Sequence, residues 1–202
     1  ASWQSRKARL KERIKLAAEA LLQAAAAREL SEAPRLTPDA GLYEEFCNRF
    51  PYAETEDQEK AIADALEDLA SGKPADRLIC GDVGFGKTEV AMRAAFVAAT
   101  AQEGPMQVAL ICPTTLLARQ HTKNFAERFR GFPVAIRQLS RLTSAKDVRD
   151  TLQGLEDGTV NIVIGTHALL GSRVTFKNLG LLIVDEEQHF GVKQKEQLKN
   201  LK

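Results

Sequence analysis

The chain has 202 residues, 44% of them hydrophobic, which is enough to bury one substantial α/β core with an appendage but not two full domains. Its formal net charge of +1 excludes a globally basic field, so any nucleic-acid surface must come from local clusters of Lys and Arg. The three cysteines are odd in number and widely spaced in apolar stretches, which fits reduced thiols packed in the core of a cytoplasmic protein and gives no metal-ligand spacing. No apolar run has membrane-spanning length, so we expect no membrane partner.

Residues 1–33 are predicted to form a helix, because apolar residues recur at three- and four-residue spacing. The residues of this stripe are Leu10, Ile14, Ala17, Leu21 and Ala25. The first half carries six basic residues and one acidic residue, Glu12, and forms either a solvated face or a contact with nucleic acid. We assign residues 1–36 to a linker helix and residues 37–202 to one domain. The absence of an initiator Met and a helical pattern that runs to Lys202 indicate a piece of a longer chain.

Two further helices are expected before residue 72. Thr37 is predicted to cap the first, whose apolar face includes Phe46 and Phe50. The second begins at Thr55, and its spacing to Gln58 is that of a capping box. Gln58 has a second interpretation, because its amide offers a donor and an acceptor together, as the edge of an adenine requires.

Residues 81–88 have the sequence Gly-Asp-Val-Gly-Phe-Gly-Lys-Thr and match the phosphate-loop pattern G-x-x-x-x-G-K-[ST]. The apolar run 77–80 before the loop predicts a short buried strand, and the alanine-rich run 89–99 after it predicts a helix. Strand, loop and helix in this order are the context in which the pattern binds phosphate.

The loop residues have separate predicted roles. Gly81, Gly84 and Gly86 allow backbone dihedrals that point N–H groups at the phosphates. Lys87 is predicted to reach the β- and γ-phosphates, and the Thr88 hydroxyl to ligate Mg²⁺.

The remaining chain alternates strands with helices, which predicts an α/β fold with a parallel sheet whose ligands bind beyond the carboxyl ends of the strands. The predicted strands are 107–112, 134–139, 160–164 and 181–184. Asp185 and Glu186 directly follow the last strand. Asp185 is predicted to hold the hydrated Mg²⁺, and Glu186 to act as general base toward the attacking water.

Two segments carry a specific resemblance. Residues 76–91 and 179–192 resemble motifs I and II of the bacterial transcription-repair coupling factors, which are superfamily-two DNA translocases. The resemblance implies a RecA-like P-loop NTPase domain that binds ATP and Mg²⁺, with Phe85 and Glu89 in the nucleotide site. Phe50, Thr55 and Gln58 are similar to the family's adenine-sensing segment, which favours adenine contacts for Gln58 and Phe50.

Segments 113–121, 140–141 and 165–170 are similar to the motifs that line the DNA track in that family. The resemblance implies that the residues contacting double-stranded DNA are Thr115, Arg141, Thr166 and His167. It also implies that RNA polymerase and nucleotide-excision-repair proteins bind through modules absent here. Without the arginine finger of a second motor domain, the piece alone is expected to be nearly inactive as an ATP hydrolase. His189 stands where the family usually has Arg, which puts the coupling of nucleotide to DNA in question.

Two alternatives stay open. A RecG-type junction helicase has closely related motifs but generally has Ser where Phe85 stands and another residue in place of Glu89. A nucleotide-gated binding module or a P-loop kinase would have no DNA track, and the set of track motifs with Asp185 and Glu186 argues against the kinase.

Overall fold

The computed structural model describes residues 30–82, 84–186 and 190, with residues 6, 7, 12, 15, 16, 18, 19, 22, 23 and 26 of the N-terminal segment. Each described position from 6 to 30 is helical, in agreement with the predicted linker helix. The predicted apolar stripe of that helix lies outside the described residues, as do His189 and the helical pattern at the end of the chain. The domain boundary at residue 36 stays a prediction.

A four-stranded parallel sheet forms the centre of the domain, which confirms the predicted fold class. Its strands are β1 (Gln107–Ile111), β2 (Ile136–Leu139), β3 (Ile162–Gly165) and β4 (Leu179–Val184), in the order β2-β3-β1-β4. Ile111 pairs with Gly165 on one side and with Val184 on the other. The carboxyl ends of β1, β3 and β4 therefore lie level at one edge of the sheet.

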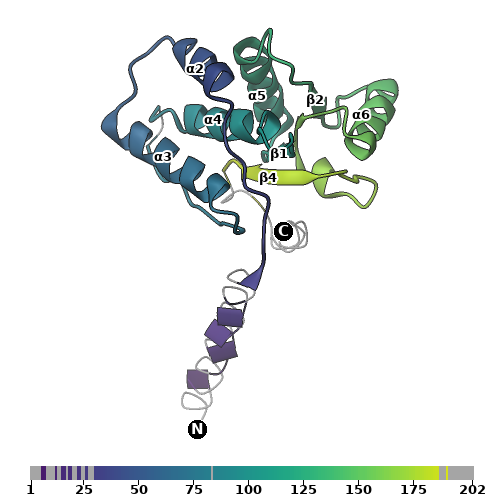
Figure 1. Cartoon of the computed structure of the whole chain (residues 1–202). Helices are drawn as coiled ribbons and strands as arrows, with labels where there is room; N and C mark the ends of the chain where they lie inside the picture. The colour runs from purple at the N-terminus through teal and green to yellow at the C-terminus, as the bar shows by residue number, and fades with distance from the viewer. Residues whose placement is uncertain are drawn as a thin grey trace.

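Helices cover both faces of this sheet (Figure 1). They are α2 (Ala40–Asn48), α3 (Glu56–Ala70), α4 (Lys87–Ala99), α5 (Thr115–Arg128) and α6 (Ala145–Asp157), with a 3₁₀ turn η1 (His167–Leu170). Because side chains alternate along a strand, Val108 and Leu110 of β1 join the core beneath α2, α4 and α5. Ala109 and Ile111 join the core beneath α6 and η1.

Helix α4 is the most deeply buried helix of the domain, because small and apolar residues surround its axis. Phe96 of α4 stacks on Phe46 of α2 with ring centroids 4.2 Å apart, and both side chains are fully buried. This packing fixes the position of the helix that the phosphate loop precedes.

The predicted cap of α2 was wrong. Asp39 is the N-cap, and its carboxylate accepts a hydrogen bond of 3.0 Å from the Leu42 backbone N–H. The Thr37 hydroxyl instead donates to the Glu103 carboxylate at 2.5 Å. Phe50 lies beyond the end of α2 rather than on its apolar face.

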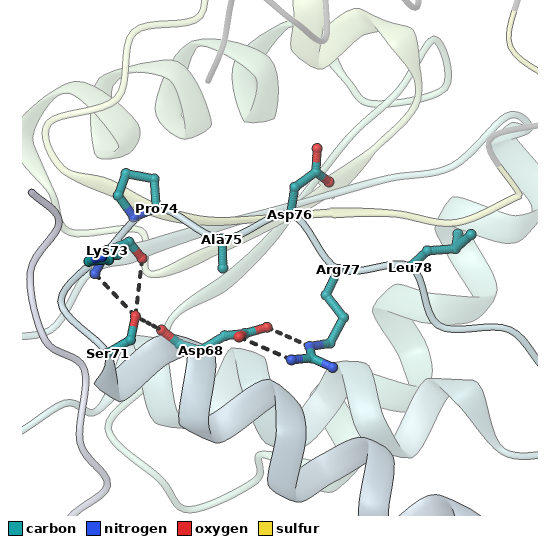
Figure 2. A pocket seen from close by; sticks show the side chains of 8 residues that line it. All are labelled: Asp68, Ser71, Lys73, Pro74, Ala75, Asp76, Arg77 and Leu78. Carbon is teal, nitrogen blue, oxygen red and sulfur yellow. Dashed lines mark hydrogen bonds and ion pairs between the residues drawn. The ribbon is translucent and has the colours of Figure 1, made fainter. Parts of the chain in front are cut away.

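The predicted buried strand at 77–80 was also wrong. The segment is irregular, and the Leu78 side chain is 81% exposed. Arg77 explains the difference, because its guanidinium lies 2.5 Å from Asp68 (Figure 2) and 3.1 Å from Asp64, and both carboxylates are on α3. These ion pairs hold the segment along α3 and leave β4 as an edge of the sheet among the described residues.

The cysteines differ from one another. Cys112 is buried, as predicted, and burial and the charge of Asp185 raise the pKa of its thiol to about 12. Cys80 is exposed, because the segment that carries it is not in the core.

Candidate nucleotide site

Two of the three glycines of the phosphate loop have the dihedrals that only glycine adopts easily, and Gly81 does not. Gly84 and Gly86 have φ values of +89° and +79°, in the left-handed region that other residues rarely adopt. Gly86 is the N-cap of α4, and within the described chain no side chain caps that end of the helix. The first N–H groups of α4 are therefore oriented as donors for an anion.

Lys87 closes the loop on itself. Its ammonium donates to the backbone carbonyl of Gly81 at 2.5 Å and to that of Asp82 at 3.0 Å. Thr88 follows in the first turn of α4 and is partly exposed. The cation predicted to reach phosphates therefore lies across the loop that would hold them.

Gln58 joins α3 to this loop. The capping box is present, since the Thr55 N–H donates to Gln58 Oε1 at 2.9 Å and the Gln58 N–H donates to Thr55 Oγ1 at 3.3 Å. The Gln58 amide also donates through Nε2 to the Phe85 carbonyl at 2.5 Å. The cap is confirmed, and the contact of Gln58 with adenine stays a prediction.

A hollow of about 700 Å³ separates α3 from the segment that leads into the loop. Its lining includes Asp57 and Lys60 of α3 and Gly81, Asp82 and Phe85 of the loop. A smaller hollow of about 530 Å³ lies at the carboxyl end of α3, beside Ser71 and Arg77 (Figure 2). Only the larger hollow reaches the phosphate loop.

A buried group of charges lies behind the loop. The Glu89 carboxylate accepts from Arg93 Nε at 2.8 Å and from Arg128 Nη2 at 2.9 Å, and Arg93 also pairs with Glu54. Burial opposes the charge of Arg93, but its bonds to Glu89 and Glu54 hold its pKa above the ordinary value. A backbone N–H, followed by the Arg93 guanidinium, lowers the pKa of Glu54. The Glu89 side chain, which we predicted to lie in the nucleotide site, faces these arginines.

Phe50 lies beside the same charges. Its ring packs edge-on against Tyr52 at 5.6 Å, with the guanidinium of Arg128 5.7 Å from its centroid. Its contact with a nucleotide base stays a prediction.

The acidic pair stands at the carboxyl end of β4. The Asp185 N–H donates to the Ile111 carbonyl at 2.9 Å, which extends the sheet ladder by one residue. Asp185 Oδ2 lies 2.7 Å from His121 Nε2, and this hydrogen bond lowers the pKa of Asp185 against the opposing effect of burial. The charge of Lys87 makes the smallest contribution to the same lowering.

Glu186 is exposed and has a φ of +53°, the only positive φ of a non-glycine residue in the described part of the chain. Strained dihedrals of this kind often occur at functional sites. The left-handed φ thus falls on the residue predicted to be the general base.

The four residues predicted to contact DNA lie near the same end of the sheet. Thr115 opens α5, His167 opens η1, and Arg141 is exposed in the turn after β2. Thr166 follows β3 and is only 3% exposed, and its hydroxyl has no hydrogen-bond partner in the described structure. Arg141 is thus open to a ligand, whereas Thr166 is covered.

The sequence model of the DEAD/DEAH box helicase family matches residues 55–202. The chain belongs to the DEAD/DEAH box helicase family. It is 55% identical over its whole length to the transcription-repair-coupling factor of Rickettsia conorii and 48% identical over 99% of its length to that of Bacillus subtilis. It spans 18% and 17% of those two proteins, respectively.

Two solved structures share the fold. RecG bound to a three-way DNA junction matches with a TM-score of 0.76 and 36% identity, over 84% of this chain and 23% of RecG. The UvsW helicase of bacteriophage T4 matches with a TM-score of 0.60 and 15% identity, over 85% of this chain and 58% of UvsW. The parallel sheet with helices on both faces is therefore the helicase RecA-like fold.

Membership in the DEAD/DEAH box helicase family implies an ATP-driven enzyme that binds nucleotide, generally with Mg²⁺. Among the described residues no group of three or more His, Cys, Asp and Glu side chains is placed to hold a metal. One carboxylate and one hydroxyl, at Asp185 and Thr88, suit Mg²⁺, which proteins bind through one or two such groups together with phosphates. No described helix is long and apolar enough to cross a membrane.

The site also contains residues to which the sequence analysis gave no role. Glu54, Arg93, Arg128 and His121 each contact a predicted site residue or its neighbour. His121 falls within a segment that resembles a track motif, but nothing in its spacing indicates a contact with Asp185.

Proposed function

We propose that this chain is the ATP-binding and Mg²⁺-binding half of a motor that moves along double-stranded DNA, in a longer protein that acts on stalled RNA polymerase and with nucleotide-excision-repair proteins. The observation that carries the proposal is the geometry of the phosphate loop, in which Gly84 and Gly86 have left-handed φ values and the Lys87 ammonium donates to the carbonyls of Gly81 and Asp82. Asp185, at the carboxyl end of β4, supplies the carboxylate that the proposal requires. The similarity to transcription-repair-coupling factors over the whole chain supports the choice of motor.

Each residue of the site has a distinct task in this proposal. The N–H groups at the start of α4 bind phosphate oxygens, and Lys87 exchanges the carbonyls of Gly81 and Asp82 for them. Thr88 and Asp185 hold Mg²⁺, which when bound offsets the negative charge of the β- and γ-phosphates. Glu186 takes the proton of the attacking water.

At the same end of the sheet, Thr115, Arg141, Thr166 and His167 contact the DNA backbone. Contacts to phosphates carry no base information, so binding is tolerant of sequence and weakens as salt rises. Arg141 is exposed for this contact, whereas the Thr166 hydroxyl is buried and has no hydrogen-bond partner in the described structure.

The direct test is nucleotide titration by calorimetry. Lys87→Ala removes a charge-assisted contact to phosphate and is expected to weaken ATP binding by about 10- to 100-fold, or roughly 1.5–3 kcal/mol. Lys146→Ala, on the exposed first turn of α6, is the matched control and should bind ATP like the wild type. Equal affinities for all three proteins would refute the assignment.

A RecG-type branched-DNA helicase motor is the second candidate, and the structural match to RecG favours it. Competition between a three-way junction and a plain duplex for the longer protein separates the two. A preference for the junction supports the RecG-type motor, and equal binding supports the translocase.

A further inference from the structure

His121 makes a contact that the proposed mechanism does not use. It lies in the second turn of α5, and its side chain is only 11% exposed. Its Nε2 lies 2.7 Å from Asp185 Oδ2, across a sequence separation of 64 residues. The contact joins the helix that begins at Thr115 to the residue that ends the β4 ladder.

The direction of this hydrogen bond follows from the chemistry of the two groups. An ionised carboxylate has only acceptor positions, so Nε2 carries the proton and donates to Asp185. Nδ1 is buried and has no partner in the described structure. A protonated Nδ1 would be an unsatisfied buried donor, so the geometry favours a proton on Nε2.

Asp185 is therefore held at two points. Its main chain is fixed by the N–H bond to the Ile111 carbonyl, and one carboxylate oxygen is fixed by His121. Together they restrict the orientation of the Asp185 side chain. Residues that hydrogen-bond a metal-binding side chain without touching the metal commonly affect how tightly that side chain binds the metal.

We propose that His121 is a positioning residue, which orients the Asp185 carboxylate for a Mg²⁺-nucleotide complex and makes that orientation depend on the position of α5. The inference rests on the proposed function, since it takes Asp185 as the metal-holding carboxylate. A shift of α5, whose first residue is predicted to touch DNA, would move His121 and with it the carboxylate.

The test compares ATP affinity in Mg²⁺ with ATP affinity in EDTA, for the 202-residue chain and its variants. His121→Leu fills similar space without a donor and is expected to reduce the Mg²⁺-dependent gain in affinity by about 10- to 100-fold. Affinity in EDTA should not change. His121→Gln places an amide N–H near the position of Nε2 and should restore most of the gain.

Two controls keep the result specific. Lys123→Ala changes an exposed residue of the same helix, which pairs only with Glu127 in the described structure, and should behave like the wild type. Should His121→Leu fail to fold, His121→Asn replaces it, because its shorter amide cannot reach Asp185. The gain should then survive in the Gln variant and be lost in the Asn variant.

The outcomes separate the two proposals. An unchanged gain in His121→Leu, or equal losses with and without Mg²⁺, would overturn the positioning role while leaving the proposed function in place. A wild-type chain that binds no ATP in either buffer would overturn the proposed function, and this inference with it.

Discussion

Replacing Glu89 with Ala should destabilise the domain more than any exposed charge substitution. The Glu89 side chain is 5% exposed, and its two arginine partners, Arg93 and Arg128, are 9% and 10% exposed. Without Glu89, Arg93 still pairs with Glu54, whose side chain is 25% exposed, and Arg128 still donates a hydrogen bond to the Phe46 carbonyl. Removing one member of a buried ion pair costs about 3–5 kcal/mol, because a charge is left uncompensated.

Urea unfolding measures this cost. With a slope of about 2 kcal/mol per molar urea, a loss of about 3–5 kcal/mol lowers the midpoint by about 1.5–2.5 M. The matched control is Glu45→Ala, which breaks the i,i+4 pair with Arg49, where the side chains are 55% and 36% exposed. That pair is worth about 0.3–0.5 kcal/mol, so its loss should barely move the midpoint.

A combined variant tests the cause. Replacing Glu89, Arg93 and Arg128 together by Leu, Met and Met removes every charge that Glu89 balances, and should recover much of the lost stability. The reasoning is refuted if Glu89→Ala and Glu45→Ala lower the midpoint equally. It is also refuted if the triple variant is less stable than Glu89→Ala.

Two further predictions concern Gln107 and the two left-handed glycines of the phosphate loop. Gln107→Leu should cost about 2–4 kcal/mol in urea unfolding, because the carbonyls of Leu155 and Val160 and the N–H of Asn178 lose a buried partner. Gly84→Ala should cost only about 1–2 kcal/mol for its left-handed φ, since the added methyl meets open space. Gly86→Ala should cost more in both thermal stability and ATP affinity, because its methyl would collide with the Gln58 amide. Equal effects of the two glycine variants would contradict this reasoning.

Much of the architecture follows from local patterns. The four strands after the loop form within three residues of their predicted starts, because each is a short apolar run between turns. The capping box at Thr55 and Gln58 forms as predicted, since all its atoms lie within one helical turn. Family resemblance added the expectation of a RecA-like fold, which the structural matches confirm.

The predictions that were wrong failed because of contacts between distant parts of the chain. Thr37 has the chemistry of a cap, but Glu103, 66 residues away, binds its hydroxyl, and Asp39 caps α2 instead. The run 77–80 is apolar enough for a buried strand, but Arg77 pairs with Asp64 and Asp68 on α3. The periodicity of a sequence does not identify such distant partners.

In the nucleotide site, too, the sequence predicts the contiguous motifs but not the bonds between distant residues. The glycine pattern and the Asp-Glu pair are contiguous in sequence and were found there, although their roles remain proposals. The bonds from Glu89 to Arg128 and from His121 to Asp185 span 39 and 64 residues. Both depend on where α5 packs, which only the assembled sheet determines.

Helix α5 is therefore bonded to the nucleotide site at two points. Near its carboxyl end Arg128 holds Glu89, in the first turn of the helix that follows the phosphate loop. Midway along the helix His121 holds Asp185, and Thr115, its first residue, is predicted to contact DNA. Because the helix is one rigid rod between these bonds, a force on its amino end acts on both the acidic pair and the phosphate loop. Such a link allows DNA binding to alter nucleotide affinity without any residue that touches both ligands, and linkage requires that nucleotide alter DNA affinity by the same factor.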